Sequence, residues 1–398
     1  MYEPLKGIKV VDFCLAGSGP SATKLLCEFG ASVIWVEPLT GSSTRNVHKY
    51  DFYTTGKRNI TLNLKSEKGM DVMHRLIADA DVFVTNYRPR AVKKLGLDYE
   101  TLSAQYPRLI YGTLTGFGTE GSEVNDAGYD PVAFWAKGGM LSDFAEKGTL
   151  LVPPIAIGDI STGAFLAGGI ATALYGREKT GKGCQVLTSL LGSAAYINHD
   201  AAVEVQYGEQ YPKSRLNPRR PLNNTYRCSD GKWFVLSLFN QFERYFDRLL
   251  TEVIDRPDLV GKYTCYEDTM GENAPAFVAI LDEAFSKMTR DEAIARLKAI
   301  DAPVNAVLTT EEMLHDPQVM ANNYFYKLEA TVPPADSIDG KIWVPASPIK
   351  FNDIESGVHG HERGPKLGEQ SVEILKEYGY TGEEIQEMLE GKITSCNK

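Results

Sequence analysis

The chain has 398 residues, 43% of them hydrophobic and 24% charged, and a formal net charge of −10. Its length predicts two or three domains, and its composition is that of a globular protein. The negative charge argues against nucleic acid or an anionic membrane surface as the main partner, so an anionic ligand would need a local cluster of cations.

Strand and helix signals alternate in the first part of the chain, over residues 1–205. The helix predicted at 20–30 has Pro20 at its start and Gly30 just past its last turn, which is where these two residue types are favoured. The alternation predicts a large Rossmann-like α/β domain with a mostly parallel sheet and helices on both faces. Strands are predicted at residues 8–13, 32–36, 81–85 and 108–113, and helices at 20–30 and 67–80.

The pattern changes after this first part. Residues 206–225 are rich in Pro, Asn and Arg, which predicts a linker, and a smaller α/β domain is expected over residues 226–325. Residues 326–398 are too few for a domain, so we expect this segment to return to the large one. It ends in a predicted capping box at Thr381 and Glu384. Within the small domain a strand is predicted at residues 232–238, and helices near 241–251, 274–286 and 290–298.

The six cysteines show neither a CxxC motif nor a Cys–His spacing, so neither a disulfide framework nor a metal site is predicted. The N-terminus lacks the apolar core of a signal peptide. The longest apolar stretch, residues 163–176, is too short to span a bilayer. We therefore expect a cytoplasmic protein without a membrane segment.

Asp159 lies just before a long helix of small residues, predicted at 164–175. A carboxylate there meets the free N–H groups of the first turn and the positive end of the helix dipole, which would keep it ionised. It could be a nucleophile that forms covalent acyl intermediates. It could equally be a plain N-cap, for which Asp is a favoured residue, and the local sequence alone favours the N-cap.

Three motifs suggest other chemistry. Residues 17–22 fit G-x-G-x-x-[GA], with Glu37 at the spacing of a dinucleotide-binding fingerprint. This motif places a ligand near the first βα turn, but little in the sequence equips the chain for hydride transfer, and no nicotinamide is expected. Residues 53–57 match Y-x-x-x-K but have the composition of a turn. Residues 176–183 resemble a P-loop, but they lack its Ser or Thr and follow a helix, so a helix C-cap is predicted.

Seven cations lie near two predicted strand ends. Asn86 and Tyr87 follow the strand at 81–85, at the carboxyl edge where open α/β sheets bind ligands. Such charges usually form a solvated face. In an acidic chain they also suit a polyphosphate with an aromatic base, held by cations and stacked on Tyr87, and coenzyme A fits this description. The cations are Lys57, Arg58, Lys65, Arg88, Arg90, Lys93 and Lys94.

Ten segments then occur in a recognisable order. Their number and order resemble class III CoA-transferases, the formyl-CoA, carnitine and bile-acid type, nearly end to end. The segments are 5–12 (LKGIKVVD), 19–20 (GP), 30–38 (GASVIWVEP), 57–65 (KRNITLNLK), 81–89 (DVFVTNYRP), 128–130 (GYD), 158–159 (GD), 180–183 (TGKG), 345–351 (PASPIKF) and 367–369 (LGE).

The resemblance implies that Asp159 is the nucleophile, forming an aspartyl–acyl anhydride and then an aspartyl-CoA thioester, with no metal. It implies an interlocked homodimer whose chains thread through each other by their linkers. Gly17 and Ser18 are candidates to stabilise the oxyanions through their N–H groups. Positions that contact CoA would be Gly17, Ser18, Leu62, Lys65, Asn86, Tyr87, Arg88, Lys94, Leu95, Tyr129 and Asp130.

Departures from the formyl-CoA enzyme concern the acceptor. Pro38 and Gly17 replace a basic residue and a Gln of that enzyme, and its tetraglycine lid has no counterpart, so we expect an acceptor larger and more apolar than oxalate. The overall sequence is most similar to transferases for (R)-2-hydroxy acids such as 2-hydroxyisocaproate or phenyllactate. Racemases of 2-methylacyl-CoA resemble the chain too, but they carry His where it has Tyr129, and Tyr is a poor second base. A racemase, a nicotinamide-dependent oxidoreductase and a CoA-binding protein without activity are the alternatives.

Overall fold

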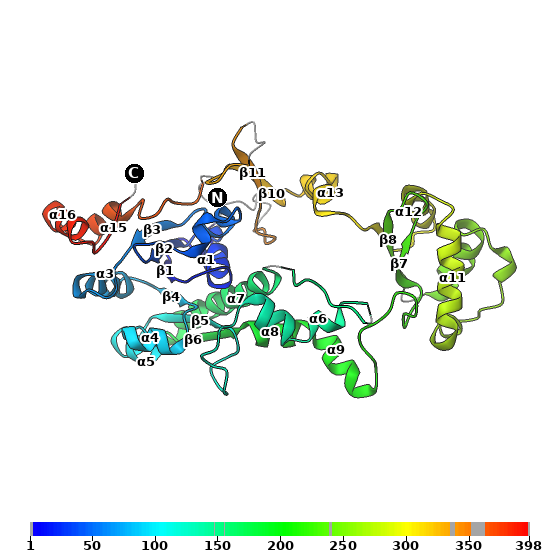
Figure 1. The fold of residues 1–398 in the computed structure, drawn as a ribbon, viewed down its shortest axis with the longest axis horizontal. Coiled ribbons are helices and arrows are strands. Elements are labelled where there is room, and N and C mark those ends of the chain that lie inside the picture. The colour runs from blue at the N-terminus through cyan, green and yellow to red at the C-terminus, as the bar shows by residue number, and fades with distance from the viewer. Residues whose placement is uncertain are drawn as a thin grey trace. The chain divides into compact units, whose positions relative to one another are not determined.

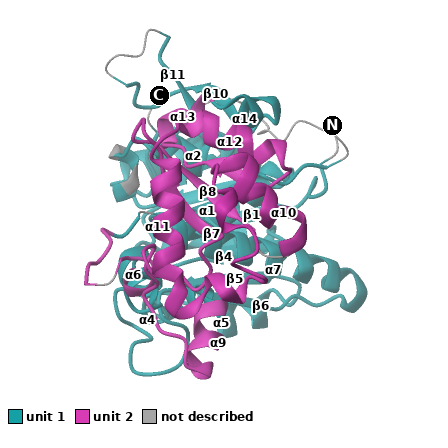
Figure 2. Cartoon of the chain, turned by 90° about the vertical axis from the view of Figure 1, so that its right-hand side faces the viewer, with its two compact units in different colours: residues 1–140, 153–199, 316–398 teal, residues 141–152, 200–315 magenta. Residues whose placement is uncertain are grey.

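The computed structural model describes residues 3–146, 148–154, 156–238, 241–334, 339–351 and 363–396. The chain divides into two compact units, shown in different colours in Figure 2. The first comprises Met1–Met140, Pro153–His199 and Asp316–Lys398, and the second comprises Leu141–Val152 and Asp200–His315.

The first unit is built on a sheet of six parallel strands in the order β3-β2-β1-β4-β5-β6. This is the strand order of a Rossmann fold, and it confirms the predicted parallel sheet. Because β1 and β4 are neighbours that connect in opposite directions, the topological switch point lies between them. The strands are β1 (Lys9–Phe13), β2 (Ser32–Glu37), β3 (Arg58–Thr61), β4 (Val82–Thr85), β5 (Ile110–Thr115) and β6 (Gln185–Ser189).

Helices cover both faces of this sheet (Figure 1). On one face α1 (Ser18–Glu28) packs against α7 (Ile157–Thr180) and against the central strands. On the other face, alternate strand residues such as Val11 and Phe13 join a core with five helices. These are α3 (Glu67–Ala78), α4 (Pro89–Leu95), α5 (Tyr99–Gln105), α15 (Ser371–Glu377) and α16 (Gly382–Glu390).

Helix α7 is long and apolar enough to cross a membrane, and it is the one such helix in the described part of the chain. The helix contacts α1, β5 and β6, so its apolar residues serve to pack it on one face of the sheet. It ends at Gly181, whose φ of 70° and N–H bond to the Arg177 carbonyl make a C-cap. The C-cap predicted for the P-loop-like segment is therefore confirmed.

Several short elements complete the first unit. The capping box at Thr381 begins α16 as predicted, with reciprocal bonds between Thr381 and Glu384. Strands β10 (Phe325–Glu329) and β11 (Lys341–Pro345) pair antiparallel. The helices are α2 (Tyr50–Thr54), α8 (Leu190–Ile197), α14 (Pro317–Ala321) and the π-helical turn η2 (Asp130–Ala136), while α6 (Met140–Asp143) begins at the boundary of the unit.

The second unit is a smaller α/β structure around an antiparallel sheet, β7-β8-β9. Its core is aromatic, with the ring of Phe285 against those of Tyr226 and Phe234. Its elements are α9 (His199–Glu204), which starts at the boundary, β7 (Asn223–Arg227), β8 (Trp233–Ser237), α10 (Phe242–Arg248), α11 (Ala274–Phe285), α12 (Arg290–Ala299), β9 (Val304–Ala306) and α13 (Thr310–Leu314).

The boundaries of the second unit differ from the predicted ones. The segment predicted as a linker, 206–225, belongs to the unit because its side chains are bonded into it. Arg215 forms an ion pair with Asp282 at 3.0 Å and donates to the carbonyl of Thr225, while Leu222 is buried in the core. Residues 316–325, predicted as part of the small domain, belong to the first unit.

Candidate active site

A cavity of about 390 Å³ lies in the first unit at the carboxyl ends of β1, β4 and β5. This is the switch point, at which open α/β sheets bind ligands. The loops after the three strands form its walls, together with the first turn of α7. Six of the predicted site residues line it, namely Ser18, Asn86, Tyr87, Arg88, Tyr129 and Asp159.

Four of the other predicted site residues lie elsewhere. Leu62 is 2% exposed and its side chain belongs to the core, against which Leu95 also packs. Lys65 and Lys94 are exposed but do not line the cavity. Sequence position alone could not distinguish these residues from cavity residues, because neighbours on a strand or helix point in different directions.

Asp159 is the third residue of α7, inside its first turn. The N-cap is Ala156, and no side chain of the cap residue bonds to the turn. The N-cap interpretation of Asp159 is therefore wrong, since its carboxylate does not serve as the cap. The side chain instead faces the cavity and approaches the first βα loop, where Ser18 lies near enough to lower its pKa.

The cap of α7 is supplied by a different carboxylate, that of Asp130. Its Oδ2 accepts a hydrogen bond from the N–H of Asp159 at 3.1 Å, and the nearby N–H groups of Gly158 and Ala156 also act to lower the pKa of this carboxylate. Asp130 is 3% exposed, and its Oδ1 is buried without a partner. We expected Asp130 to contact CoA, but in the structure it lies beneath the helix end as its anchor.

Burial and the charge of Asp130 together raise the pKa of Asp159 to about 6, against the lowering effects of Lys49 and Ser18. The helix dipole was expected to keep this carboxylate ionised at its ordinary pKa, and this expectation is corrected. The dipole is already neutralised by Asp130 at the same helix end, so desolvation outweighs it. Asp159 is thus mostly ionised at pH 7 and becomes protonated in mild acid.

Gly17 leaves room for the Asp159 side chain. A Cβ at position 17 would overlap Asp159 Oδ2, and it would stand 3.0 Å from Asp159 Cγ and 3.2 Å from the hydroxyl of Tyr53. Next to it, Ser18 is the first residue of α1, and the first N–H groups of a helix have no partner within the helix. The carboxylate thus lies beside backbone donors.

The loop that carries Gly17 is held in place by Asn86. The Asn86 side chain donates to the carbonyl of Leu15 at 2.6 Å and accepts from its N–H at 2.8 Å. Between Leu15 and Gly17, Ala16 has a φ of 58°, a left-handed conformation that is costly for alanine. Such strain gathers at functional sites, where the surrounding structure enforces it.

The predicted cluster of seven cations is smaller than expected. Lys57 is fully buried, and its ammonium donates to Asp12 at 2.9 Å and to Thr23 at 2.7 Å. Arg58 forms ion pairs with Glu373 and Glu377. These two cations are used within the protein. The exposed members of the cluster are Lys65, Arg88, Arg90, Lys93 and Lys94.

Tyr87 stacks on Phe13, with the ring centroids 4.4 Å apart and the planes at 14°. Phe13 thereby covers one face of the Tyr87 ring, so a base would have to stack on the other face. Burial raises the pKa of Tyr87 to about 12, which keeps the phenol neutral at physiological pH.

Two residues near Asp159 were missed by sequence reasoning. Lys49 is exposed and its charge acts on Asp159 and Asp130, and Tyr53 is 3% exposed with its hydroxyl near Gly17. Tyr53 stands in the Y-x-x-x-K segment that was set aside as a turn. That segment is the end of α2 followed by a turn, and only its tertiary position brings the phenol to the site.

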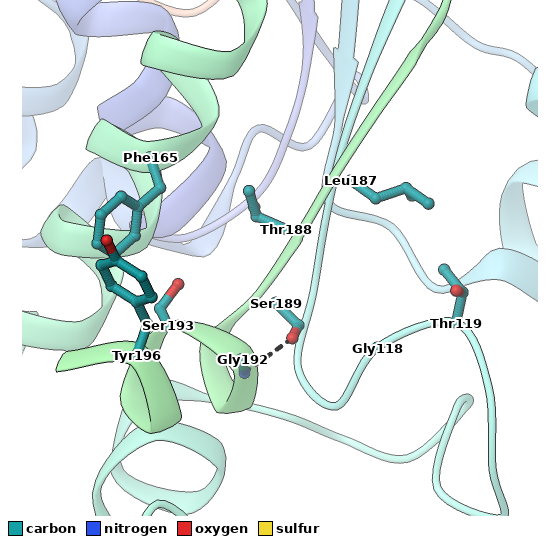
Figure 3. A pocket seen from close by; sticks show the side chains of 9 residues that line it. All are labelled: Gly118, Thr119, Phe165, Leu187, Thr188, Ser189, Gly192, Ser193 and Tyr196. Atoms are coloured by element: carbon teal, nitrogen blue, oxygen red, sulfur yellow. Dashed lines mark hydrogen bonds between the residues drawn. The ribbon is translucent and has the colours of Figure 1, made fainter. Parts of the chain in front are cut away.

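A second cavity in the same unit, of about 450 Å³, lies beside the edge strand β6. Figure 3 shows it between Phe165 of α7, Leu187 of β6 and Tyr196 of α8. Its lining carries no charged side chain and is mainly apolar. It therefore lacks the groups that the first cavity offers for covalent chemistry. Among the described residues no group of three or more His, Cys, Asp or Glu side chains is arranged to hold a metal.

The comparisons with known proteins agree with this site. The model of CoA-transferase family III matches residues 5–371. The chain is 34% identical to the cinnamoyl-CoA:phenyllactate CoA-transferase of Clostridium sporogenes, over 98% of this chain and 97% of that protein. It is 32% identical to the (R)-2-hydroxy-4-methylpentanoate CoA-transferase of Clostridioides difficile, over 98% and 99%.

Solved structures show the same fold. The structure of a CAIB/BAIF family protein from Brucella suis superposes with a TM-score of 0.80 at 28% identity, over 95% of this chain and 100% of that one. A protein of Mycobacterium tuberculosis gives a TM-score of 0.81 at 25% identity, over 94% and 99%. The family match and the extent of these similarities lead to one conclusion: the chain belongs to CoA-transferase family III and is an enzyme of that family.

Proposed function

We propose that this CoA-transferase moves CoA from an acyl-CoA to an (R)-2-hydroxy acid, with Asp159 as the covalent nucleophile. The observation that carries the proposal is the half-buried Asp159 carboxylate at the carboxyl edge of the parallel sheet, beside Gly17 and the first turn of α1. A carboxylate in that place is ionised at neutral pH, is within reach of a ligand in the cavity, and faces backbone donors.

The first half of the reaction loads the enzyme. An Asp159 oxygen attacks the thioester carbonyl carbon, the C–S bond breaks, and CoA leaves as a thiolate while a mixed anhydride forms. The thiolate then attacks the carbonyl carbon of Asp159 in the anhydride. The donor acid leaves as a carboxylate, and CoA is held as an aspartyl thioester.

The second half runs these steps in reverse with the acceptor. Its carboxylate attacks the aspartyl thioester, CoA leaves as a thiolate, and a new anhydride forms. Attack of the thiolate on the acceptor carbonyl gives the new acyl-CoA and frees the Asp159 carboxylate. A thioester and a carboxylate are consumed and the same two groups are made, so the exchange needs little net free energy.

The exposed cations support CoA as the carried group. Arg88 and Arg90 line the cavity, and Lys93 and Lys94 follow on the exposed surface of α4. We propose that these side chains bind the phosphates of CoA, because Lys and Arg are the usual phosphate partners. The free face of Tyr87 would take the adenine. Lys65 would contribute from the loop after β3.

The acceptor is proposed from the relatives and from the space at the nucleophile. The two CoA-transferases of Clostridium sporogenes and Clostridioides difficile are named for phenyllactate and (R)-2-hydroxy-4-methylpentanoate, which are both 2-hydroxy acids with an apolar side chain. In this chain Gly17 places no side chain beside Asp159. An acid with a branched or aromatic side chain is therefore our preferred acceptor.

We further propose that the enzyme is a cytoplasmic homodimer with interlocked chains. The surface around the second cavity (Figure 3) supports a partner, because Phe165, Leu187 and Tyr196 are 40%, 46% and 73% exposed. Apolar side chains gathered in this way are typical of protein interfaces. They lie along the edge strand β6 and the two helices beside it. A second copy of the chain would cover them.

The test of the covalent step uses hydroxylamine. After incubation with an acyl-CoA and no acceptor, hydroxylamine should convert the activated Asp159 to a hydroxamate, located by peptide mass spectrometry. The Asp159→Asn variant should fold normally, lose more than about a thousandfold in rate and show no hydroxamate. Near-normal transfer by this variant, or a hydroxamate on another residue, would refute Asp159 as the nucleophile.

A further inference from the structure

The hydroxyl group of Tyr53 lies close to Asp159, the proposed nucleophile. The residue is 3% exposed and lies in the last turn of α2. Its ring contacts Phe52 edge to face, and the ammonium of Lys49 lies 6.0 Å from its centroid. No hydrogen bond of its hydroxyl joins it to any part of the chain that the structure describes. This hydroxyl is therefore available to water or to a ligand.

The position of this hydroxyl relative to Asp159 is fixed through Gly17. The point at which a Cβ of residue 17 would stand is 3.2 Å from the Tyr53 hydroxyl and 3.0 Å from Asp159 Cγ. The phenol and the carboxylate therefore flank the same small space. A group bonded to Asp159 and extending past Gly17 comes within reach of Tyr53.

The phenol is a hydrogen-bond donor throughout the working pH range. Burial and the charges of Asp159 and Asp130 raise the pKa of Tyr53 far above its ordinary value. The two carboxylates disfavour a phenolate at this place. The group therefore serves a ligand by donating to a neutral oxygen, and it does not act as a base.

We propose that Tyr53 is a specificity-determining residue that donates a hydrogen bond to the 2-hydroxyl group of the acceptor acid. In the anhydride of the proposed mechanism, this hydroxyl stands three bonds from the oxygen that bridges the acceptor to the Asp159 carbonyl carbon. It thus falls close to the nucleophile, on which the Tyr53 hydroxyl also borders. This inference rests on the proposed function, and it adds how a 2-hydroxy acid is distinguished from the acid without the hydroxyl.

The expected discrimination between the two acids comes from the free-energy cost of leaving a hydroxyl group without a hydrogen bond. An acid with hydrogen at C2 displaces water from the phenol hydroxyl and gives it no hydrogen bond in return, whereas a 2-hydroxy acid restores the bond. Sites built to bind a substrate hydroxyl reject the analogue that lacks it far more strongly than apolar pockets reject a missing methylene. In the Tyr53→Phe variant the penalty disappears, so the two acids should become similar acceptors.

The experiment measures kcat/KM for two acceptors, (R)-2-hydroxy-4-methylpentanoate and 4-methylpentanoate, with one acyl-CoA donor. Tyr53→Phe should lower the ratio of the two values about 10- to 100-fold, because the hydroxy acid loses its hydrogen bond and the other acid no longer leaves the phenol unpaired. Tyr50→Phe is the matched control, since Tyr50 belongs to the same helix and its hydroxyl is bonded to the Pro365 carbonyl at 2.5 Å. Its ratio should equal that of the wild type.

Three results would overturn the inference. The first is an equal loss with both acids, which would make Tyr53 a donor to the oxyanion. The second is an unchanged ratio in Tyr53→Phe. The third is a wild-type enzyme that uses both acids equally, a result that does not depend on the folding of any variant.

Measurements on the same samples distinguish a failure of this inference from a failure of the proposed function. Tyr53→Phe should still form the Asp159 hydroxamate with acyl-CoA alone, because that half-reaction involves no acceptor. A wild-type enzyme without the hydroxamate would contradict the covalent mechanism, and it would do so whatever the acceptor ratios are.

Discussion

At the scale of single residues, the site depends on two carboxylates with separate tasks. Asp130 accepts bonds from the first N–H groups of α7, and Asp159 is left with its carboxylate facing the cavity. Burial and, after it, the charge of the nearby Asp130 raise the pKa of Asp159. A nucleophile with a raised pKa is a stronger base, and it is still ionised at the pH of the cell.

This arrangement predicts a pH effect. The reaction requires ionised Asp159, so kcat/KM should fall as the pH drops through about 6, the pKa of this group. Asp130→Asn retains an acceptor for the N–H groups but removes the like charge, so it should lower the pKa of Asp159. The acidic limb of the pH–rate profile should therefore move to lower pH. An unmoved limb, or one displaced upward, would show that Asp130 does not tune the nucleophile through its charge.

At the scale of elements, the βα loop that carries Gly17 rests on a buried ion pair. Lys57, just before β3, reaches under α1 to Asp12 of β1 and donates to the carbonyl of Pro20 at 3.0 Å and to Thr23. Both side chains of the pair are 0% exposed. Strand β1, the start of β3 and the first helix are thereby fixed together across the intervening β2, which holds the loop against the nucleophile.

Breaking this pair should destabilise the protein much more than breaking an exposed one. Lys57→Met leaves the Asp12 charge buried without compensation, at a cost of about 3–5 kcal/mol. Arg58→Met, at the next position, removes exposed ion pairs with Glu373 and Glu377 and should cost about 0–1 kcal/mol. Urea denaturation of both variants gives the comparison. Equal free energies of unfolding would contradict the role given to Lys57.

At the scale of the whole molecule, the apolar surface along β6 predicts self-association. Leu187 lies on β6, which is the edge strand of the sheet among the described residues, and Tyr196 is 73% exposed beside it. Exposed edges of this kind are usually covered in stable proteins. We propose that a second copy of the chain covers the apolar surface along β6.

The double variant Leu187→Glu, Tyr196→Glu should therefore keep two chains from assembling into the dimer as they fold. Light scattering coupled to size-exclusion chromatography should give the mass of one chain for the variant and of two for the wild type. Lys376→Glu, an exposed change on α15 at the other face of the sheet, is the control and should leave the mass unchanged. A wild-type enzyme that is monomeric at micromolar concentration would refute the dimer.

Asp159 became the candidate nucleophile only through the resemblance to the family, since the local sequence alone favours an N-cap. The sequence by itself was enough to predict the alternating elements and the parallel sheet. Those features are encoded locally, in runs of β-branched residues, in helix starts and ends such as Thr381 and Gly181, and in motifs of fixed order. A local signal survives in the folded chain because it needs no distant partner to be satisfied.

Only the tertiary structure decided which charged and polar groups are free to act. From the sequence, Lys57 was a candidate to bind phosphate. In the structure its ammonium is instead buried against Asp12, which is 45 positions away in the chain. Asp130 caps a helix that begins far along the chain, and Tyr53 meets Asp159 only through the space at Gly17. Burial and partners are set by contacts between distant segments, and these two properties determine the pKa of a group and its availability.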